Sequence, residues 1–419
     1  MSFDATQAPS CGVAIIGYGV AGVNCAIALR CSGYTGPIRV FSATSTPPYS
    51  PILTSYYAGG EKSYEECFPW TEAELSDLDL EVLADCPVER LEPAAHLITT
   101  SRGSFSYSKA LIATGARPAT WGYPADADCK PLVLRTMEDA ERLKAALCAE
   151  PRPRVLVSGA SMVALKALEA ALARGCQASI VGVNPHVLDF NAVPETASRF
   201  ERGLAAKGVK MRFGTSIASV KGADGGPYTV SFANGESEEF DLIVVAHGVV
   251  SNLDFLPEGA FALDRGLLVD RFMRTSDPDV YAAGDIAQSH ELITGESRII
   301  GIWKNAALQG AAAGKAIAAE LAGREPDEAD AFEGSFITNT IAVDGTLFIS
   351  AGASTLTPER RAVIDESEDI TVARIYERAD DGTDRLVGFN LTCDEDIEGS
   401  RAYDIGAILT MRIEKSLRN

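Results

Sequence analysis

The stretch CGVAIIGYGVAG, residues 11–22, decides the fold of this chain of 419 residues. Its apolar part, residues 12–16, predicts a buried strand, and residues 23–30, rich in Ala, Ile and Leu, predict a helix. The segment Gly17-Tyr18-Gly19-Val20-Ala21-Gly22 lies between them, and residues 38–41 predict a second strand. The order of strand, turn, helix and strand is that of a βαβ unit.

The three glycines of this turn each have a separate steric role. Gly17 allows the tight turn, Gly19 lets the backbone approach a pyrophosphate, and Gly22 lets the helix pack closely on the strand. The peptide groups of Val20 and Ala21 open the helix, whose N-terminus stabilises negative charge. The motif therefore predicts a dinucleotide site, with a glycine-rich turn that binds nothing as the alternative.

One element of the usual dinucleotide motif is missing. An acidic residue at the end of the second strand usually binds a ribose hydroxyl group. Here the chain continues from residue 42 as Ser-Ala-Thr-Ser, so no carboxylate is available there. Ser42 can form a hydrogen bond to a ribose, although less distinctively, and we expect it to be the contact at this position.

The same order of elements returns about 140 residues later, which indicates an internal duplication. Residues 154–157 predict a strand, residues 158–161 a tight turn, residues 162–174 a helix, and residues 178–181 another strand.

The second turn departs from the glycine pattern. It reads Gly-Ala-Ser-Met-Val-Ala, and we expect Gly159, Ser161 and Met162 to approach a nicotinamide dinucleotide. Residues 181–184 (VGVN) supply neither an acid for a ribose 2′-hydroxyl nor a nearby Arg for a 2′-phosphate. NADH is therefore slightly preferred over NADPH, because a phosphate would need positive charge. A structural domain that binds no nucleotide is the alternative.

Composition excludes several other classes of function. The net charge of −21, from 58 Asp and Glu against 37 Lys and Arg, opposes binding to duplex DNA and to anionic membranes. The sequence contains no apolar run of about 18 residues and no secretory signal. Nine scattered cysteines, without any CxxC pair, give no metal or dithiol motif. We therefore expect a cytoplasmic protein without a metal, without nucleic acid and without membrane insertion.

Three later segments, in a fixed order, carry a family resemblance. They are Ala113-Thr114-Gly115, Gly284-Asp285 and the run WKNAALQG that begins at Trp303. Together with the first turn they resemble the pyridine nucleotide–disulfide oxidoreductase superfamily, whose members are flavoproteins. The resemblance implies bound FAD, with Ala113, Thr114 and Gly115 where the chain leaves the FAD domain. It also implies that Asp285, after Gly284, binds the ribityl chain and that the helix from Trp303 caps the isoalloxazine.

Within this superfamily the chain is similar to the branch of rubredoxin and ferredoxin reductases, NADH oxidases and the flavin module of nitrite reductases. The segments PYSP at 48–51, which contains Tyr49, and YAG at 57–59 resemble the loop of that branch that contacts the flavin. The tail segments 345–352 and 386–389 resemble the C-terminal domain of the nitrite-reductase-like members. Residues 48–60 contain no Cys, which implies a family member that lacks the redox disulfide.

Lys166 departs from the family pattern. The family usually has Glu at this position, paired with a Lys from the flavin loop. Residues 50–60 contain no Lys, so the pair is replaced by one cation. The resemblance implies that Lys166 lies near flavin N5 and stabilises negative charge on the reduced flavin or on a bound acceptor. A solvated lysine on the helix surface is the alternative.

We therefore expect an α/β fold with two Rossmann-like domains, as in glutathione reductase, and a C-terminal α+β domain. Residues 1–118 and 252–328 would form the FAD domain, 119–251 the NAD(P)-binding-type domain and 334–419 a dimerisation domain. The expected function is transfer of electrons from NAD(P)H through FAD to a protein or small-molecule acceptor, in a homodimer. The alternatives are an electron-transfer or structural subunit of a larger complex, with a non-functional nicotinamide site, and a redox-inert binding module.

Overall fold

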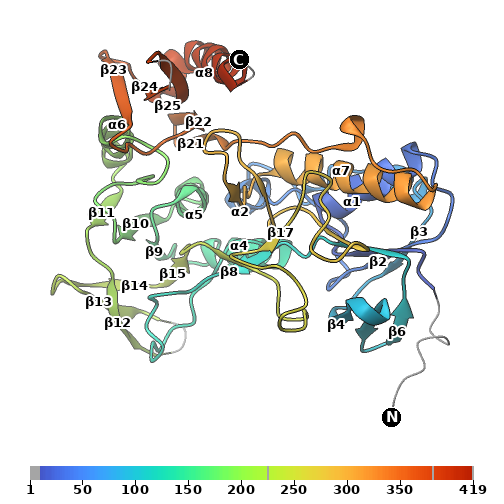
Figure 1. Ribbon diagram of the computed structural model, residues 1–419. Coiled ribbons are helices and arrows are strands. Elements are labelled where there is room, and N and C mark those ends of the chain that lie inside the picture. Colours follow the sequence, from blue (N-terminus) through green and yellow to red (C-terminus); the bar gives the residue numbers. More distant parts are fainter. Residues whose placement is uncertain (1–9, 224–225, 380–381, 418–419) are drawn as a thin grey trace. The chain divides into compact units, whose positions relative to one another are not determined.

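The computed structural model describes residues 10–223, 226–379 and 382–417, which form two compact units (Figure 1). The first unit contains the described residues up to Ser50, Glu65–Arg117 and Val250–Ser335. The second unit contains Pro51–Tyr64, Pro118–Val249 and the described residues from Phe336 onward. The division into three domains that the sequence suggests stays a prediction.

A parallel five-stranded sheet forms the core of the first unit. In spatial order its strands are β18 (Val280–Ala282), β7 (Lys109–Ile112), β1 (Val13–Ile16), β2 (Ile38–Phe41) and β3 (Leu80–Leu83). Every residue of β1 and β2 is buried, as expected in a sheet covered on both faces, and the one charged residue among them, Arg39 of β2, pairs with Glu81 of β3 at 2.6 Å. Helix α1 (Val20–Cys31) connects β1 to β2 and begins three residues earlier than the sequence pattern indicates.

Two helices of the first unit, α1 and α7 (Trp303–Leu321), pack with their backbones unusually close together (Figure 1). A Cβ on Gly310 would lie 2.2 Å from the carbonyl oxygen of Ala21, and one on Gly314 would lie 2.4 Å from that of Cys25. Glycine at these two positions of α7 therefore sets the distance between the helices.

The other elements of the first unit are short. One antiparallel sheet consists of β4 (Val88–Glu92), β5 (Leu97–Thr100) and β6 (Gly103–Ser106). A second small sheet consists of β17 (Leu267–Leu268), β19 (Ala287–His290) and β20 (Ser297–Arg298). The unit also contains helix α3 (Glu72–Ser76) and the 3₁₀ turns Glu65–Cys67, Pro93–Ala95 and Glu328–Asp330. Strands β8 (Ala116–Pro118) and β16 (Val249–Ser251) pair with each other.

A second parallel sheet forms the core of the second unit. In spatial order its strands are β11 (Lys210–Phe213), β10 (Gln177–Gly182), β9 (Arg154–Ser158) and β15 (Leu242–Val245). The same unit contains the helices α4 (Met137–Leu147), α5 (Met162–Ala173) and α6 (Pro194–Ala206). It also contains an antiparallel sheet of β12 (Ile217–Gly222), β13 (Tyr228–Phe232) and β14 (Ser237–Phe240). The unit β9–α5–β10 repeats the order of β1–α1–β2, which confirms the internal duplication.

The short helix α2 (Thr54–Gly59) is part of the second unit and is fastened to α4 and α5. A Cβ on Gly59 would lie 3.3 Å from the Cα of Ala170, so the two helices touch through their backbones. Arg174 donates from Nε to the carbonyl oxygen of Ala58 at 2.9 Å. The Nζ of Lys144 lies 4.1 Å from the centroid of the Tyr57 ring.

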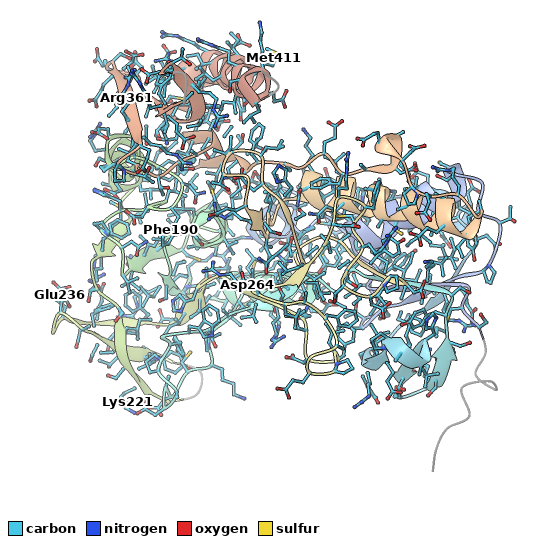
Figure 2. All side chains as sticks on the ribbon, in the orientation of Figure 1. Phe190, Lys221, Glu236, Asp264, Arg361 and Met411 are labelled. Carbon is cyan, nitrogen blue, oxygen red and sulfur yellow. The ribbon has the colours of Figure 1, made fainter. Side chains whose placement is uncertain are left out.

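The C-terminal part of the second unit is an antiparallel sheet with one long helix, α8 (Glu395–Leu417). In spatial order the strands are β21 (Thr338–Val343), β22 (Thr346–Gly352), β25 (Asp384–Asp394), β24 (Ile370–Arg378) and β23 (Arg360–Glu366). Helix α8 exposes Ile397, Ile408 and Met411, of which Met411 is labelled in Figure 2. The α/β fold class with a C-terminal α+β part is confirmed.

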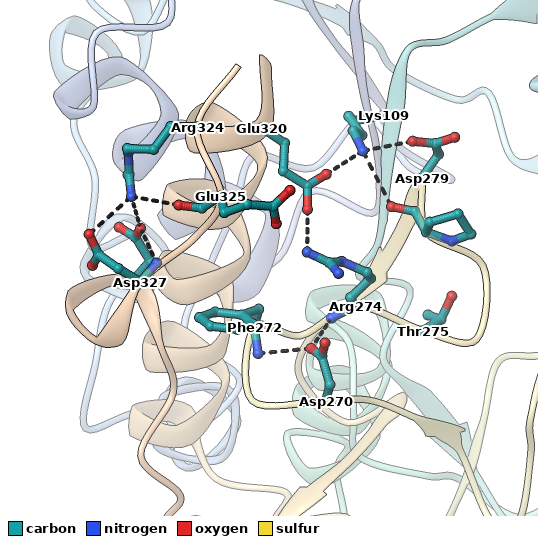
Figure 3. A network of polar contacts seen from close by, with 12 residues as sticks. Lys109, Asp270, Phe272, Arg274, Thr275, Asp279, Glu320, Arg324, Glu325 and Asp327 are labelled. Carbon is teal, nitrogen blue, oxygen red and sulfur yellow. Dashed lines mark hydrogen bonds and ion pairs between the residues drawn. The ribbon is translucent and has the colours of Figure 1, made fainter. Parts of the chain in front are cut away.

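A network of ion pairs joins β7, the chain before β18 and the end of α7 in the first unit (Figure 3). Lys109 Nζ lies 2.6 Å from Asp279 Oδ1 and also contacts Glu320, which in turn contacts Arg274. Burial disfavours the charged form of Glu320, but the hydrogen bond from Lys109 is among the contacts that hold its pKa below the ordinary value. The network therefore fixes the C-terminal end of α7 on the sheet.

Replacement of Gly314 by Ala should destabilise the protein. Within a helix this change normally stabilises by about 1 kcal/mol, because Ala has the higher helix propensity. Here the new methyl group would meet the Cys25 carbonyl oxygen, so we expect a net loss of about 2 kcal/mol and a lower Tm in thermal unfolding. Gly399→Ala in α8 is the control, since its Cβ would meet only the flexible Glu395 side chain at 3.2 Å. Equal stability changes in the two variants would contradict this interpretation.

Candidate functional site

The turn between β1 and α1 requires glycine at two positions. Gly17 has φ +113°, and a Cβ there would lie 2.2 Å from the carbonyl oxygen of Ala113, at the end of β7. A Cβ on Gly22 would lie 2.3 Å from the carbonyl oxygen of Gly17. Any side chain at either position would push the turn away from the strand or from the helix.

Gly19 differs from these two glycines, because the protein itself leaves room for a side chain there. No heavy atom of the described residues lies within 4 Å of a Cβ built on Gly19, and its φ of −92° suits any residue. Gly19 is also the N-cap of α1, which has no side-chain cap and no acid in its first turn. The N–H groups of Val20 and Ala21 are therefore free to bind an anion that comes close to the backbone. This open, uncapped helix start fits a diphosphate.

The Ala113-Thr114-Gly115 segment lies directly beside this turn. The N–H of Ala113 donates to the carbonyl oxygen of Ile16 at 2.8 Å, which continues the pairing of β1 with β7. Gly115 has φ +62° and turns the chain. Thr114 and Asn252 exchange two hydrogen bonds, from Thr114 Oγ1 to the Asn252 carbonyl at 3.1 Å and from Asn252 Nδ2 to the Thr114 carbonyl at 2.9 Å.

The Gly284-Asp285 segment reaches the same end of the sheet. A Cβ on Gly284, which has φ +83°, would lie 3.4 Å from the Cβ of Ala21 in the first turn of α1. The N–H of Gly284 donates to Gln309 Oε1 of α7 at 2.7 Å. The carbonyl oxygen of Asp285 accepts from Ser251 Oγ at 3.0 Å, which fixes the backbone that carries the carboxylate. Three motifs that are far apart in sequence thus meet at the N-terminus of α1.

Helix α7 begins beside this cluster. Trp303 is its first residue and stacks on Trp70, with ring centroids 5.7 Å apart and an interplanar angle of 29°. Asn305 is fully buried and donates from Nδ2 to the carbonyl oxygen of Ile300 at 2.9 Å. Its Oδ1 is buried and accepts no hydrogen bond from the described residues, so one acceptor remains for a bound group.

Ser42 and Tyr49, the other two residues expected at the FAD site, also belong to the first unit. Ser42 is 6% exposed, and its Oγ donates to the carbonyl oxygen of Thr44 at 2.7 Å. The hydroxyl group is thus engaged in its own turn and can only accept from a ribose. Tyr49 is half-buried. Both contacts with FAD stay predictions.

The turn between β9 and α5 in the second unit has the same geometry as the first. Gly159 has φ +124°, and a Cβ there would lie 2.3 Å from the carbonyl oxygen of Ala246, just after β15. Ser161 is the N-cap of α5 and makes no side-chain capping bond, and Met162 begins the helix. The degenerate sequence therefore keeps an uncapped helix start, and the proposed roles of Gly159, Ser161 and Met162 stay predictions.

Sequence reasoning missed the counterpart of the Ala-Thr-Gly segment in the second unit. Ala246, His247 and Gly248 follow β15 as Ala113, Thr114 and Gly115 follow β7, and Gly248 again has positive φ, at +93°. The sequence pattern that could have identified this segment is Ala-x-Gly directly after a predicted buried strand.

His247 has a structural position in this segment. Its Nε2 lies 2.9 Å from Ser158 Oγ, and its Nδ1 contacts the carbonyl oxygen of Trp121. Burial lowers the pKa of His247, so the ring is neutral near pH 7.

Lys166 lies on α5 and is not solvated, because only 14% of its side chain is exposed. Its Nζ lies 3.7 Å from the centroid of the Tyr56 ring and also contacts the carboxylate of Glu169. Glu169, one turn further along the same helix, thus supplies a carboxylate partner within α5, and the expected position of Lys166 near flavin N5 stays a prediction. Burial lowers the pKa of Lys166 to about 8, although the charge of Glu61 favours the protonated form.

The described residues form no metal centre and no disulfide. None of the nine cysteines, all within the described residues, forms a disulfide, and seven of them are buried. The described part of the chain has no cluster of three or more His, Cys, Asp or Glu that could hold a metal ion. None of the described helices has the length and apolarity to cross a bilayer.

Comparison with known proteins gives consistent matches. The family described as pyridine nucleotide-disulphide oxidoreductase matches residues 12–310. A rubredoxin-NAD(+) reductase of Pseudomonas putida is 30% identical over 289 residues, which cover 68% of this chain and 74% of the relative. The NADH-dependent phenylglyoxylate dehydrogenase subunit epsilon of Aromatoleum evansii is 29% identical over 82% of this chain and 79% of its own length. The structure of a covalent putidaredoxin reductase–putidaredoxin complex matches with TM-score 0.80 and 22% identity, covering 96% of this chain and 93% of the other.

Replacement of Gly19 by Val should abolish flavin binding without unfolding the protein. The side chain has room in the protein but would fill the space in front of the uncapped helix start. We expect the variant to be purified without yellow colour, with a Tm within a few degrees of wild-type apoprotein and a cost of about 1 kcal/mol or less. Flavin content by absorbance and thermal unfolding of the apoproteins check both parts. Gly17→Ala should instead destabilise the apoprotein as well, and normal flavin content in Gly19→Val would refute the assignment.

Proposed function

This chain belongs to the pyridine nucleotide-disulphide oxidoreductase family, and on that basis we propose that it oxidises NADH and passes the electrons through FAD to a small electron-carrier protein. The observation that carries the proposal is the convergence of Gly17–Gly22, Ala113–Gly115 and Gly284–Asp285 at one uncapped helix start. FAD, when bound, accepts a hydride from the nicotinamide and releases the electrons onward.

The residues of the first unit would bind and orient FAD. The N–H groups of Gly19, Val20 and Ala21 would bind the diphosphate, and the carboxylate of Asp285 would accept hydrogen bonds from ribityl hydroxyl groups. A Cβ on Gly301 would lie 3.6 Å from Asp285 Oδ1, so a glycine faces this carboxylate and leaves access to it. The stacked pair of Trp303 and Trp70 would exclude water from the flavin.

The acceptor is proposed from the relatives. Two relatives are named as a rubredoxin-NAD(+) reductase and a putidaredoxin reductase, and rubredoxin and putidaredoxin are protein acceptors. The described residues contain no disulfide, which supports electron transfer without a redox disulfide. A small one-electron carrier protein is therefore the acceptor class that we propose.

We also propose that the protein is a cytoplasmic homodimer. Nine cysteines that form no disulfide among the described residues suit a reducing compartment. The exposed Ile397, Ile408 and Met411 of α8 share one helix face and supply an apolar surface that a second copy could cover.

A second candidate function is an electron-transfer subunit of a larger enzyme. The phenylglyoxylate dehydrogenase subunit matches 82% of this chain, whereas the rubredoxin reductases match 66–68%. The match to the dehydrogenase subunit therefore includes more of this chain than the matches to the rubredoxin reductases, which supports the subunit alternative.

Anaerobic mixing of the purified holoprotein with NADH separates a protein with a functional nicotinamide site from a subunit in which that site is non-functional. A reductase should lose its flavin absorbance near 450 nm within seconds, because hydride transfer at typical enzymatic rates is about 1–1000 per second. A subunit with a non-functional nicotinamide site should keep its absorbance with NADH and lose it with dithionite. A purified protein that binds no flavin at all would disprove both functions.

Lys166 is the residue that we propose to act on the flavin electrostatically. Its buried cation is held in place by the Tyr56 ring and the Glu169 carboxylate, so it can stabilise negative charge that forms nearby. The low exposure of this charge makes its effect larger than that of a surface lysine.

Replacement of Lys166 by Met should lower the flavin midpoint potential by about 30 mV or more, which corresponds to about 1.4 kcal/mol for two electrons. Because Lys166 has its pKa at about 8, its contribution should be complete below pH 8 and disappear as the pH rises through that value. Potentiometric titrations from pH 6 to 10 check this, with Lys144→Met as the control for a cation over a tyrosine ring. An unchanged potential and an unchanged pH profile in Lys166→Met would remove Lys166 from the mechanism.

A further inference from the structure

The segment that follows β10 determines what surrounds the ribose of a bound nicotinamide nucleotide. In a βαβ unit of this type, the ribose that carries the 2′-hydroxyl lies beyond the carboxyl end of the second strand. That strand ends at Gly182, where a Cβ would lie only 3.0 Å from the Cβ of Ala160 in the turn. The close contact leaves no room for an acidic side chain at the strand end.

The following loop is fixed against the same turn. The N–H of Leu188 donates to the carbonyl oxygen of Ala160 at 2.8 Å, so the loop touches the proposed dinucleotide turn. The N–H of Gly214 donates to the carbonyl oxygen of Asn184 at 3.0 Å. Two apolar side chains of the loop, Val183 and Phe190, are exposed by 71% and 74% (Figure 2). This is a surface on which an adenine ring could lie.

A carboxylate from another element reaches this loop. Glu201 of α6 accepts from the N–H of Val187 at 3.0 Å and lies 3.2 Å from His186 Nδ1. Its side chain is only 17% exposed, so its direction is fixed. Val187 is adjacent to Leu188, which makes the hydrogen bond to the turn. Glu201 thus brings a carboxylate from α6 to the loop that follows β10.

The neighbouring arginines are engaged elsewhere. On α6, Arg199 donates to Thr371 Oγ1 at 2.6 Å, and Arg202 lies 3.4 Å from Glu366. On β11, Arg212 lies 3.2 Å from Glu236. In the described parts of α6, β11 and the loop, each arginine pairs with at least one acceptor, and Arg212 keeps one buried donor, Nη1, without a partner.

We propose that Glu201, positioned by His186 and Val187, is the residue that selects NADH over NADPH. This inference rests on the proposed function. The carboxylate would repel the 2′-phosphate of NADPH, because like charges brought together at a binding site oppose association. It would leave NADH, whose 2′ position is a neutral hydroxyl group, unaffected.

The test compares Glu201→Gln with wild type in anaerobic flavin reduction at low ionic strength. The glutamine amide oxygen keeps the hydrogen bond from Val187, so only the charge is removed. We expect the second-order rate constant with NADPH to rise about tenfold while that with NADH changes less than about twofold. Glu195→Gln, an exposed carboxylate in the first turn of the same helix, is the control for net charge and should change neither rate constant.

The outcomes distinguish the inference from the proposed function. If NADH reduces the flavin but the ratio of the two rate constants is the same in Glu201→Gln as in wild type, Glu201 is not the selecting residue and the function stands. If Glu195→Gln changes the ratio equally, the effect is one of overall charge and the inference is wrong. If neither nucleotide reduces the wild-type flavin, the proposed function fails and the inference fails with it.

Discussion

The tight contact between a turn glycine and a strand-end carbonyl group is the constraint on which the two sheets depend. In the first unit the Ala113 carbonyl oxygen occupies the space that a side chain on Gly17 would need, and in the second unit the Ala246 carbonyl oxygen does the same at Gly159. The contact holds the end of β7 in the first unit, and the end of β15 in the second, against the turn. The start of the helix is thereby directed away from the strand end. The same steric arrangement thus occurs at the uncapped N-termini of α1 and α5, where we propose that anions bind.

The sequence alone was sufficient for the parts that depend on local steric rules. The glycine spacing from Gly17 to Gly22, the continuous apolar strands and the repeat of β1–α1–β2 as β9–α5–β10 are all visible within short windows. The Ala-Thr-Gly and Gly-Asp segments could be placed only through their family resemblance. They lie far from the first turn in sequence and are brought to it by sheet order, which no local pattern encodes.

The side-chain environments could not be predicted in the same way. No sequence pattern indicated that Lys166 would lie over the Tyr56 ring and pair with Glu169. The contact of Glu201 with the loop after β10 was likewise not foreseen, because an acid was sought only at the strand end. Such partners come from separate helices, and their positions depend on how those helices pack rather than on residue spacing.

The attachment of α2 has a mechanical consequence. The segment that contains α2 follows the first unit in sequence, yet its backbone contact with Ala170 and the hydrogen bond from Arg174 anchor it to α5. Helix α5 is also the helix whose N-terminus faces the proposed nicotinamide nucleotide. Any displacement of α5 would therefore be passed directly to Tyr56 and Tyr57 of α2, so the two helices should move as one body within the second unit.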